Sequence, residues 1–228
     1  GAGEHGALPH YRVNIETNAP ILNGSLFLID SGGQYDCGTT DITRTISVGE
    51  ISDEMKDRFT RVLKGHIALS RIKFPANTPG CMLDTLARAS LWDGGFDYDH
   101  GTGHGVGAYL GVHEGPQRIA KVLANVPLIE GMVVSNEPGF YKAGAYGIRI
   151  ENLQYVTKAE IPEGGERPMH RFQTLTLAPI DTRAINFALM TREEIQWLNE
   201  YHNRVFREIG PHLNDADRDW LKAATKEV

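Results

Sequence analysis

The chain alternates between short apolar runs of strand length and longer amphipathic segments of helix length. Residues 24–30 form an apolar run that ends at Asp30, which predicts a buried strand. A turn-rich stretch over 31–40 follows, and residues 41–49 alternate between apolar and polar as a strand does. Together these segments predict a hairpin centred near Tyr35 and Asp36.

Helical signals come next along the chain. Ser52 is predicted to begin a helix, because acidic residues follow it directly and apolar residues recur at helical spacing as far as Leu69. Pro75 and Pro79 are expected to end this helix, since proline lacks the amide that a helix interior needs. A second helix is predicted over residues 82–92.

The second half of the chain repeats the sequence of strands and then helices. Strands are predicted over residues 127–136, 147–156 and 171–180, with a loop rich in proline, glycine and glutamate over 160–168. Thr191 is predicted to cap a third helix, and a last helix is predicted to start near Asn214 or Asp215. This order favours an α+β fold over a doubly wound parallel sheet.

Composition narrows the classes of partner. The formal charge of −6 and the pI near 5.8 argue against nucleic acid as a partner, because phosphate binding needs a basic surface. No apolar run approaches the ~20 residues of a membrane span, so no membrane partner is expected. Cys37 and Cys81 provide neither a disulfide framework nor a thiolate zinc site, which fits a reducing cytoplasm. The chain starts at Gly1 rather than at methionine, and we expect further residues upstream.

Four acidic residues stand where hairpins would bring them together. Asp30 ends one predicted strand and Asp41 begins the next, so the two carboxylates are expected to lie nearly opposite each other. Glu137 ends another apolar strand, and a hairpin folded at Gly144 would face it toward Glu151. Like charges in such pairs destabilise a sheet unless a positive charge lies between them.

A glycine-rich stretch over residues 99–116 lies between the two hairpins and carries His100, His104 and His113. Taken singly, these acids and histidines would be capping, solvated or structural residues. Four carboxylates and an imidazole on one face would repel strongly, and a pair of divalent ions would resolve the repulsion. An oxygen-rich site with one imidazole suits Mn²⁺, Fe²⁺, Co²⁺ or Zn²⁺. Two such ions generate a hydroxide near neutral pH.

Five segments in this order resemble one family: IDSGGQYDCGTTDITRT, HGTGHGVG, VHEGP, NEPGFY and GIRIEN. They are similar to the pita-bread metallopeptidases and, within these, to the Xaa-Pro aminopeptidases. The specific resemblance runs from about His10 to Val156, and the tail resembles the C-terminal extension of the family. It implies a curved antiparallel sheet with flanking helices in two pseudo-symmetric halves. It also implies two divalent ions, first of all Mn²⁺, with Zn²⁺, Co²⁺ or Mg²⁺ as alternatives.

The resemblance assigns a role to each matching residue. The implied metal ligands are Asp30, Asp41, His104, Glu137 and Glu151, of which Asp41 and Glu151 would bridge the two ions. Glu137 would also accept the proton of the attacking water. The implied residues around the substrate are His10, His100 and His113, with Arg149 orienting a carboxylate ligand. The glycines around His104 would let a strand pass close to metals and substrate.

The implied activity is release of the N-terminal residue from peptides with proline at the second position, by attack of a metal-activated hydroxide. Residues 1–160 would form the catalytic domain, without its first helices and the creatinase-like N-terminal domains. Residues 161–228 would complete the sheet and form the helical C-terminal extension. Without the missing part of the same protein, we expect the sheet to expose an apolar face.

Four alternatives stay open from the sequence. A prolidase would share all five ligands but cleave only dipeptides, and a methionine aminopeptidase would lack the helical extension. A non-catalytic pita-bread module would bind peptides or proteins without metal. The tail could also make a homodimer through Trp197, Tyr201 and Trp220, although such residues more often pack in a core.

Overall fold

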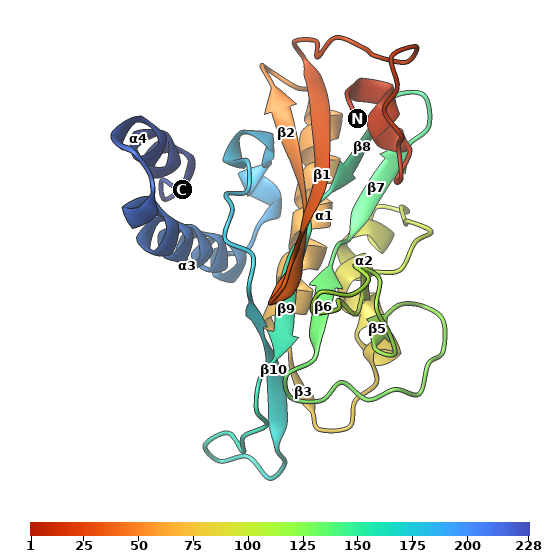
Figure 1. Cartoon of the computed structure of the whole chain (residues 1–228), viewed down its shortest axis with the longest axis vertical. Coiled ribbons are helices and arrows are strands. Elements are labelled where there is room, and N and C mark those ends of the chain that lie inside the picture. Colours follow the sequence, from red (N-terminus) through yellow and green to blue (C-terminus); the bar gives the residue numbers. More distant parts are fainter.

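Antiparallel hairpins and a short sheet form the frame of the chain, as the computed structural model of residues 1–228 shows (Figure 1). The strands are β1 (Ser25–Tyr35), β2 (Gly38–Val48), β3 (Lys73–Pro75), β4 (Gly103–His104), β5 (Arg118–Ile119), β6 (Val133–Asn136), β7 (Gly139–Lys142), β8 (Tyr146–Arg149), β9 (Asn152–Val156) and β10 (Met169–Thr174). The helices are α1 (Asp53–Arg71), α2 (Asp84–Trp92), α3 (Arg192–Ile209) and α4 (Asp215–Ala224), with short 3-10 helices over Gly3–Ala7, Gly80–Met82, Thr182–Ala184, Phe187–Leu189 and Gly210–His212.

All strand pairings are antiparallel. One sheet has the order β3-β10-β9-β6, and three hairpins pair β1 with β2, β4 with β5, and β7 with β8. The pairs Asn136–Asn152 and Gly139–Arg149 share one register, so β6 leads into β7 and β8 leads into β9 across short breaks in the ladder. The α+β prediction is confirmed.

Helix α1 lies behind the strands and supplies one wall of the core (Figure 1). Its N-cap is Ser52, whose hydroxyl accepts a hydrogen bond from the amide of Met55, as the sequence predicts. A Cβ on Gly65 would lie 2.0 Å from the carbonyl oxygen of Ala87, so the glycine allows α1 to approach α2 closely. Helix α2 begins at Asp84, two residues later than predicted, because a 3-10 turn occupies Gly80–Met82.

Several predicted strands have different bounds in the structure. Strand β1 continues past Asp30 to Tyr35, because the glycine-rich stretch joins the ladder and the turn shrinks to Asp36 and Cys37. The predicted strand over 127–136 is a strand only over Val133–Asn136, apart from an isolated bridge between Pro127 and Pro79, and in place of the strand over 171–180 the structure has Met169–Thr174. The predicted strand over 147–156 is two strands, separated at residues 150 and 151.

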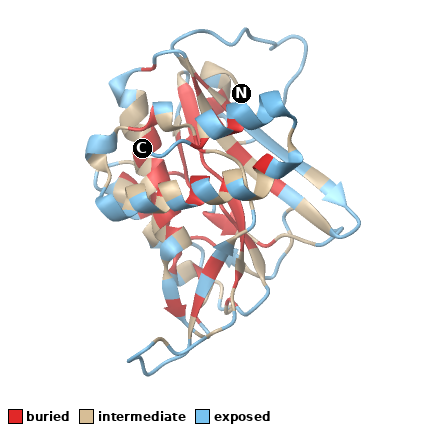
Figure 2. Ribbon diagram, turned by 90° about the vertical axis from the view of Figure 1, so that its left-hand side faces the viewer, coloured by how far each residue is buried: buried red, intermediate tan, exposed pale blue.

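The C-terminal helices pack beside the strands rather than on the sheet face that α1 covers (Figure 1). Thr191 caps α3 through a capping box with Glu194, and Asn214 caps α4, as predicted. Buried residues lie on the strands and on the inner sides of the helices (Figure 2). Tyr201 is buried, whereas Trp220 is 64% exposed.

An apolar groove of about 530 Å³ lies between the β1–β2 hairpin and α4. Its lining includes Ile29, Ile42, Ile46 and Trp220. None of the helices combines the length and the apolar character that spanning a membrane requires.

Candidate active site

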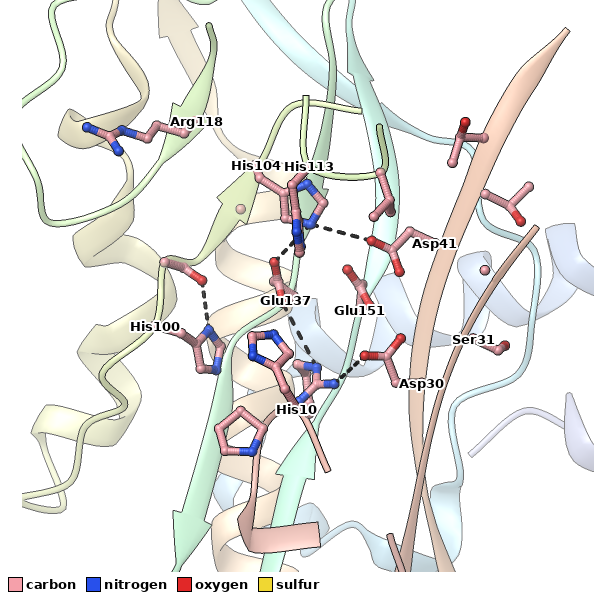
Figure 3. Close-up of a pocket in the computed structure, with 18 of the residues that line it drawn as sticks. His10, Asp30, Ser31, Asp41, His100, His104, His113, Arg118, Glu137 and Glu151 are labelled. Atoms are coloured by element: carbon pink, nitrogen blue, oxygen red, sulfur yellow. Dashed lines mark hydrogen bonds and ion pairs between the residues drawn. The ribbon is translucent and has the colours of Figure 1, made fainter. Parts of the chain in front are cut away.

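An open cleft of about 800 Å³ collects nearly all the residues singled out by the sequence (Figure 3). Strands β1 and β2 form one side, the segment from His100 to Val122 forms the other, and the breaks between β6 and β7 and between β8 and β9 form the floor. The predicted residues that line it are His10, Asp30, Asp41, His100, His104, His113, Glu137, Arg149 and Glu151.

The first carboxylate pair differs from the predicted geometry. Asp30 pairs with Thr43, and Asp41 pairs with Gly32, so the two aspartates are offset by two residues along the hairpin. Residues spaced by two on a strand share one face, so both side chains still point into the cleft (Figure 3). The prediction that they lie nearly opposite is wrong, because the hairpin is centred between Asp36 and Cys37 rather than near Tyr35.

The second carboxylate pair lies at the breaks in the ladder. The register places Glu137 opposite Glu151, as a hairpin folded at Gly144 predicts. Neither amide continues the ladder, because that of Glu137 donates to the carbonyl of Thr102 at 2.8 Å and that of Glu151 to the carbonyl of Thr43 at 3.1 Å. These bonds attach Glu137 to the side of the cleft formed by the histidine-rich segment and Glu151 to the side formed by β2.

His104 joins the two pairs. Its Nε2 lies 3.4 Å from Asp41 Oδ2 and 3.3 Å from Glu137 Oε1 (Figure 3). Its Nδ1 donates to the carbonyl of Gly105 at 2.9 Å, which fixes the ring with Nε2 toward the carboxylates. Burial alone would lower the pKa of His104, but the carboxylates of Asp41 and Glu137 outweigh it and raise that pKa to about 9.

The glutamates lie in a setting that disfavours two negative charges. Burial raises the pKa of Glu137 to about 7, against the opposing effects of His104 and Arg149. Burial and the nearby carboxylates of Glu137 and Asp41 raise the pKa of Glu151 to about 8. Perturbed groups of this kind mark functional sites more often than ordinary surface.

The donor set fits divalent cations. Oxygen atoms of Asp41 and Glu151 and a ring nitrogen of His104 all lie within 4.8 Å of one another. Asp30 and Glu137 add two more carboxylates to the same cleft. An anchored imidazole with one nitrogen facing carboxylates is the usual arrangement of a metal-binding histidine. The residues therefore match hard or borderline ions such as Mn²⁺, Mg²⁺, Co²⁺ or Zn²⁺.

A partly buried chain of hydrogen bonds runs beside the carboxylates. Arg149 donates to Asp30 Oδ2 at 2.7 Å and to the hydroxyl of Tyr141 at 2.9 Å. Nδ1 of His100 donates to the carbonyl of Gly101 at 2.8 Å, so its Nε2 accepts from the Tyr141 hydroxyl at 2.8 Å. Burial lowers the pKa of His100 to about 4, which keeps the ring neutral.

The other two histidines lie more openly in the cleft. The ring of His113 packs edge-on against His104, with 4.2 Å between centroids. Burial and the neighbouring His104 lower the pKa of His113. His10 is exposed, and its ring lies in the cleft between His100 and Asp30 (Figure 3). Both rings lack a hydrogen-bond partner within the chain and are free to meet a ligand.

Three hydroxyl residues of the site escaped the sequence reasoning. Thr43 donates to Glu151 Oε2 at 2.8 Å, Ser135 donates to Glu137 Oε1 at 3.2 Å, and Tyr141 joins Arg149 to His100. Each of the three lies within or next to a segment that carries one of the acids. For Thr43 the available signal was its position two residues after Asp41, because residues two apart on a strand share one face.

One glycine near His104 is required by a close approach. A Cβ on Gly103 would lie 2.1 Å from the carbonyl oxygen of Ser135, so only glycine allows β4 to pack against β6 here. The contact that the glycine permits is therefore with neighbouring backbone, and it places His104 next to Glu137.

Comparisons with known proteins agree over the whole chain. The profile of Metallopeptidase family M24 matches residues 1–158, and that of the C-terminal region of peptidase M24 matches residues 168–228. Aminopeptidase P2 of Arabidopsis thaliana is 50% identical over 100% of this chain and 32% of its own length. Aminopeptidase P1 of Lotus japonicus is 48% identical over 99% of this chain and 35% of its own length. The chain thus spans about a third of these curated relatives.

Solved structures give the same picture. The X-prolyl aminopeptidase of Caenorhabditis elegans, described as a cytosolic enzyme with a di-nuclear active site, has a TM-score of 0.95 and 43% identity. It covers 99% of this chain, which covers 37% of it. The prolidase of Pyrococcus furiosus has a TM-score of 0.65 and 30% identity, covering 78% of this chain and 48% of its own.

Proposed function

Because the chain belongs to metallopeptidase family M24 and has its pita-bread fold, we propose that it carries the active site of a dinuclear aminopeptidase. The enzyme would release the N-terminal residue from peptides with proline at the second position. The observation that carries this choice is the extent of the likeness. Aminopeptidases P1 and P2 are 48% and 50% identical over nearly the whole chain and the X-prolyl aminopeptidase matches it with a TM-score of 0.95, whereas the prolidase is 30% identical with a TM-score of 0.65.

The proposed metal ligands are the acids and the imidazole at the centre of the cleft: Asp30, Asp41, His104, Glu137 and Glu151. We propose two ions, and Mn²⁺ as their identity, because the donors are mostly oxygen with one imidazole. Bound there, divalent ions would lower the pKa of water and polarise a peptide carbonyl.

The chain's own residues would then orient the peptide and move the protons. Glu137 Oε would take the proton from the attacking water, since the pKa of this carboxyl is already raised to about 7. The ring N–H of His113, which has no partner within the chain, would donate to the developing oxyanion. His100 would face the scissile bond, held in one tautomer by the Tyr141 hydroxyl. Arg149 would hold Asp30 in place through their 2.7 Å ion pair.

His10, which is exposed in the cleft, would contact the substrate peptide. The proposal also places the protein in the cytosol, as described for the enzyme of Caenorhabditis elegans. Its partners would be short peptides, a second copy of the chain in a homodimer, and the remaining part of the same protein.

The test measures metal content and cleavage together. The purified chain is loaded with Mn²⁺ and given Arg-Pro-Pro and, separately, the dipeptide Arg-Pro, with and without a chelator. Release of arginine from the tripeptide that requires about two ions per chain is the expected result. Cleavage of the dipeptide alone would identify a prolidase and contradict the proposal.

Two variants sharpen this experiment. Glu137→Gln should retain part of the Mn²⁺ affinity and lose nearly all cleavage, because the amide cannot accept the proton. Glu54→Gln is the matched control, because Glu54 is an acid outside the cleft that pairs with Lys142. Equal activity of wild type and Glu137→Gln would rule out the assigned role of Glu137.

A further inference from the structure

Arg44 lies on β2 between Thr43 and Thr45, and its side chain points away from the metal ligands, behind the cleft. Its guanidinium donates to the carbonyl oxygens of Thr43 (2.9 Å), Glu151 (2.6 Å), Ala178 (2.9 Å) and Pro179 (2.9 Å), to Asn152 Oδ1 (2.7 Å) and to the Tyr201 hydroxyl (3.0 Å). Six oxygen atoms therefore share the five N–H groups of one guanidinium.

Two of these contacts fix the backbone of Glu151. Nη1 of Arg44 bridges the carbonyls of Thr43 and Glu151, while the Glu151 amide donates to the same Thr43 carbonyl at 3.1 Å. The amide and the carbonyl of Glu151 are thus both held to β2, in the short break that separates β8 from β9 along the chain. Thr43 adds a hydrogen bond to the Glu151 carboxylate at 2.8 Å.

The remaining contacts of the Arg44 guanidinium are with the C-terminal region. Tyr201 is 5% exposed and lies on α3, and its hydroxyl donates to the carbonyl of Ala178 at 2.8 Å while it accepts from Arg44. Asn152, next to Glu151, is fully buried and also contacts His66 of α1 at 3.2 Å. The position of Glu151 is therefore tied through one guanidinium to α3.

We propose that Arg44 is a positioning residue through which Tyr201 and the C-terminal helices hold Glu151 in its metal-binding position. This inference rests on the proposed function, because it takes Glu151 as a ligand. It gives the segment 168–228 an indirect part in metal binding, because none of its residues lines the cleft and its effect reaches Glu151 through Arg44. Removal of groups that orient a ligand typically weakens metal binding about 10- to 100-fold.

Arg204 offers a matched control on the same helix. It lies on α3, donates to the carbonyl of Thr174 at 2.7 Å, and pairs with Glu208 at 2.9 Å. It thus ties α3 to the end of β10 as Arg44 ties it to β2, without any contact to Glu151 or its neighbours. Loss of this tie should cost stability but leave the metal ligands in place.

The experiment compares Tyr201→Phe, Arg44→Met and Arg204→Met in the full chain. Calorimetry gives the Mn²⁺ affinity, thermal unfolding of the metal-free protein gives the stability, and cleavage of Arg-Pro-Pro gives kcat and KM. We expect Arg44→Met to weaken Mn²⁺ binding at least tenfold and Tyr201→Phe severalfold. The kcat of both variants should fall with KM nearly unchanged, because the guanidinium of Arg44 and the hydroxyl of Tyr201 lie outside the substrate cleft. Arg204→Met should lower only the unfolding temperature.

The outcomes separate the two proposals. Wild-type Mn²⁺ affinity in both Tyr201→Phe and Arg44→Met would overturn the inference while leaving the proposed function intact. An equal loss of affinity in Arg204→Met would overturn it too, because the effect would then be general loosening. If Arg44→Met does not fold, Tyr201→Phe, which removes one oxygen atom, decides alone. A wild-type protein that binds no Mn²⁺ would overturn both proposals.

Discussion

Metal binding should depend steeply on pH, because the cleft holds protons that a cation must displace. Without metal, the pKa of Glu137 is raised to about 7 by burial and that of Glu151 to about 8 by burial and neighbouring carboxylates. The pKa of His104 is raised to about 9, because the carboxylates of Asp41 and Glu137 outweigh its burial. A carboxylate or an imidazole binds a metal ion only in its deprotonated form, so each of the three proposed ligands would have to lose its proton.

The magnitude follows from these pKa values. At pH 6, a ligand group with a pKa of about 8 weakens metal binding about 100-fold, because it must first lose its proton; a group with a pKa of about 7 weakens binding about tenfold. Because Glu137 and Glu151 titrate as a coupled pair, these two factors are not multiplied; a gain in Mn²⁺ affinity of about 100-fold is expected from pH 6 to pH 9, and His104 acts with the same sign. Stability of the metal-free fold changes in the opposite direction. Protonated glutamates stabilise it fully below their unfolded pKa near 4.5, and this contribution is lost as pH rises through 7 to 8.

Titration calorimetry with Mn²⁺ at several pH values, in buffers with different protonation heats, counts the protons released. In Glu151→Gln the affinity should fall, and its slope against pH should decrease by about one proton. Glu54→Gln, outside the cleft, should retain the wild-type slope. An affinity that changes less than tenfold between pH 6 and pH 8 would refute the reasoning, since it would mean that the buried glutamates are already ionised at pH 6.

Three substitutions test the supports of the site. Gly103→Ala should weaken Mn²⁺ binding by a factor of ten or more, because its Cβ would lie 2.1 Å from the Ser135 carbonyl oxygen; unchanged calorimetric affinity would contradict this. Thr43→Val should lower stability by about 1–3 kcal/mol in urea unfolding, because it removes a buried hydrogen bond to Glu151; no loss would mean that water replaces the hydroxyl. Tyr141→Phe should reduce kcat on Arg-Pro-Pro and leave Mn²⁺ affinity unchanged, because its hydroxyl contacts the histidine and arginine beside the ligands; a parallel loss of affinity would disprove that separation.

The sequence predicted the elements with strong local signals. Ser52, Thr191 and Asn214 cap helices where their side chains indicate, because a cap depends on a few adjacent residues. Strand ends were predicted less well. Strand β1 continues to Tyr35 through two glycines, because pairing with β2 outweighs the low strand propensity of glycine.

The site shows the same division. The acids and histidines were predicted because their types limit the chemistry they perform, and the register around Gly144 could be derived from symmetry about one turn. The offset between Asp30 and Asp41 could not, because the turn at Asp36 and Cys37 is set by pairing along the whole hairpin. Supporting hydroxyls such as that of Tyr141 depend on contacts between distant segments, and no local pattern predicts these.

The breaks in the strand ladder explain why the cleft forms at this place. A continuous ladder would pair the amides of Glu137 and Glu151 within the sheet, where backbone bonds are best satisfied. Here those amides instead bind the carbonyls of Thr102 and Thr43, so each glutamate is fixed to a different wall of the cleft. Burying both carboxylates this close together destabilises the metal-free fold by more than His104 and Arg149 offset, as the raised pKa values of the two glutamates indicate. On the proposed function, the contacts that hold Glu151 from behind, among them those of Arg44, would offset this cost and keep the proposed ligand position formed before a cation arrives.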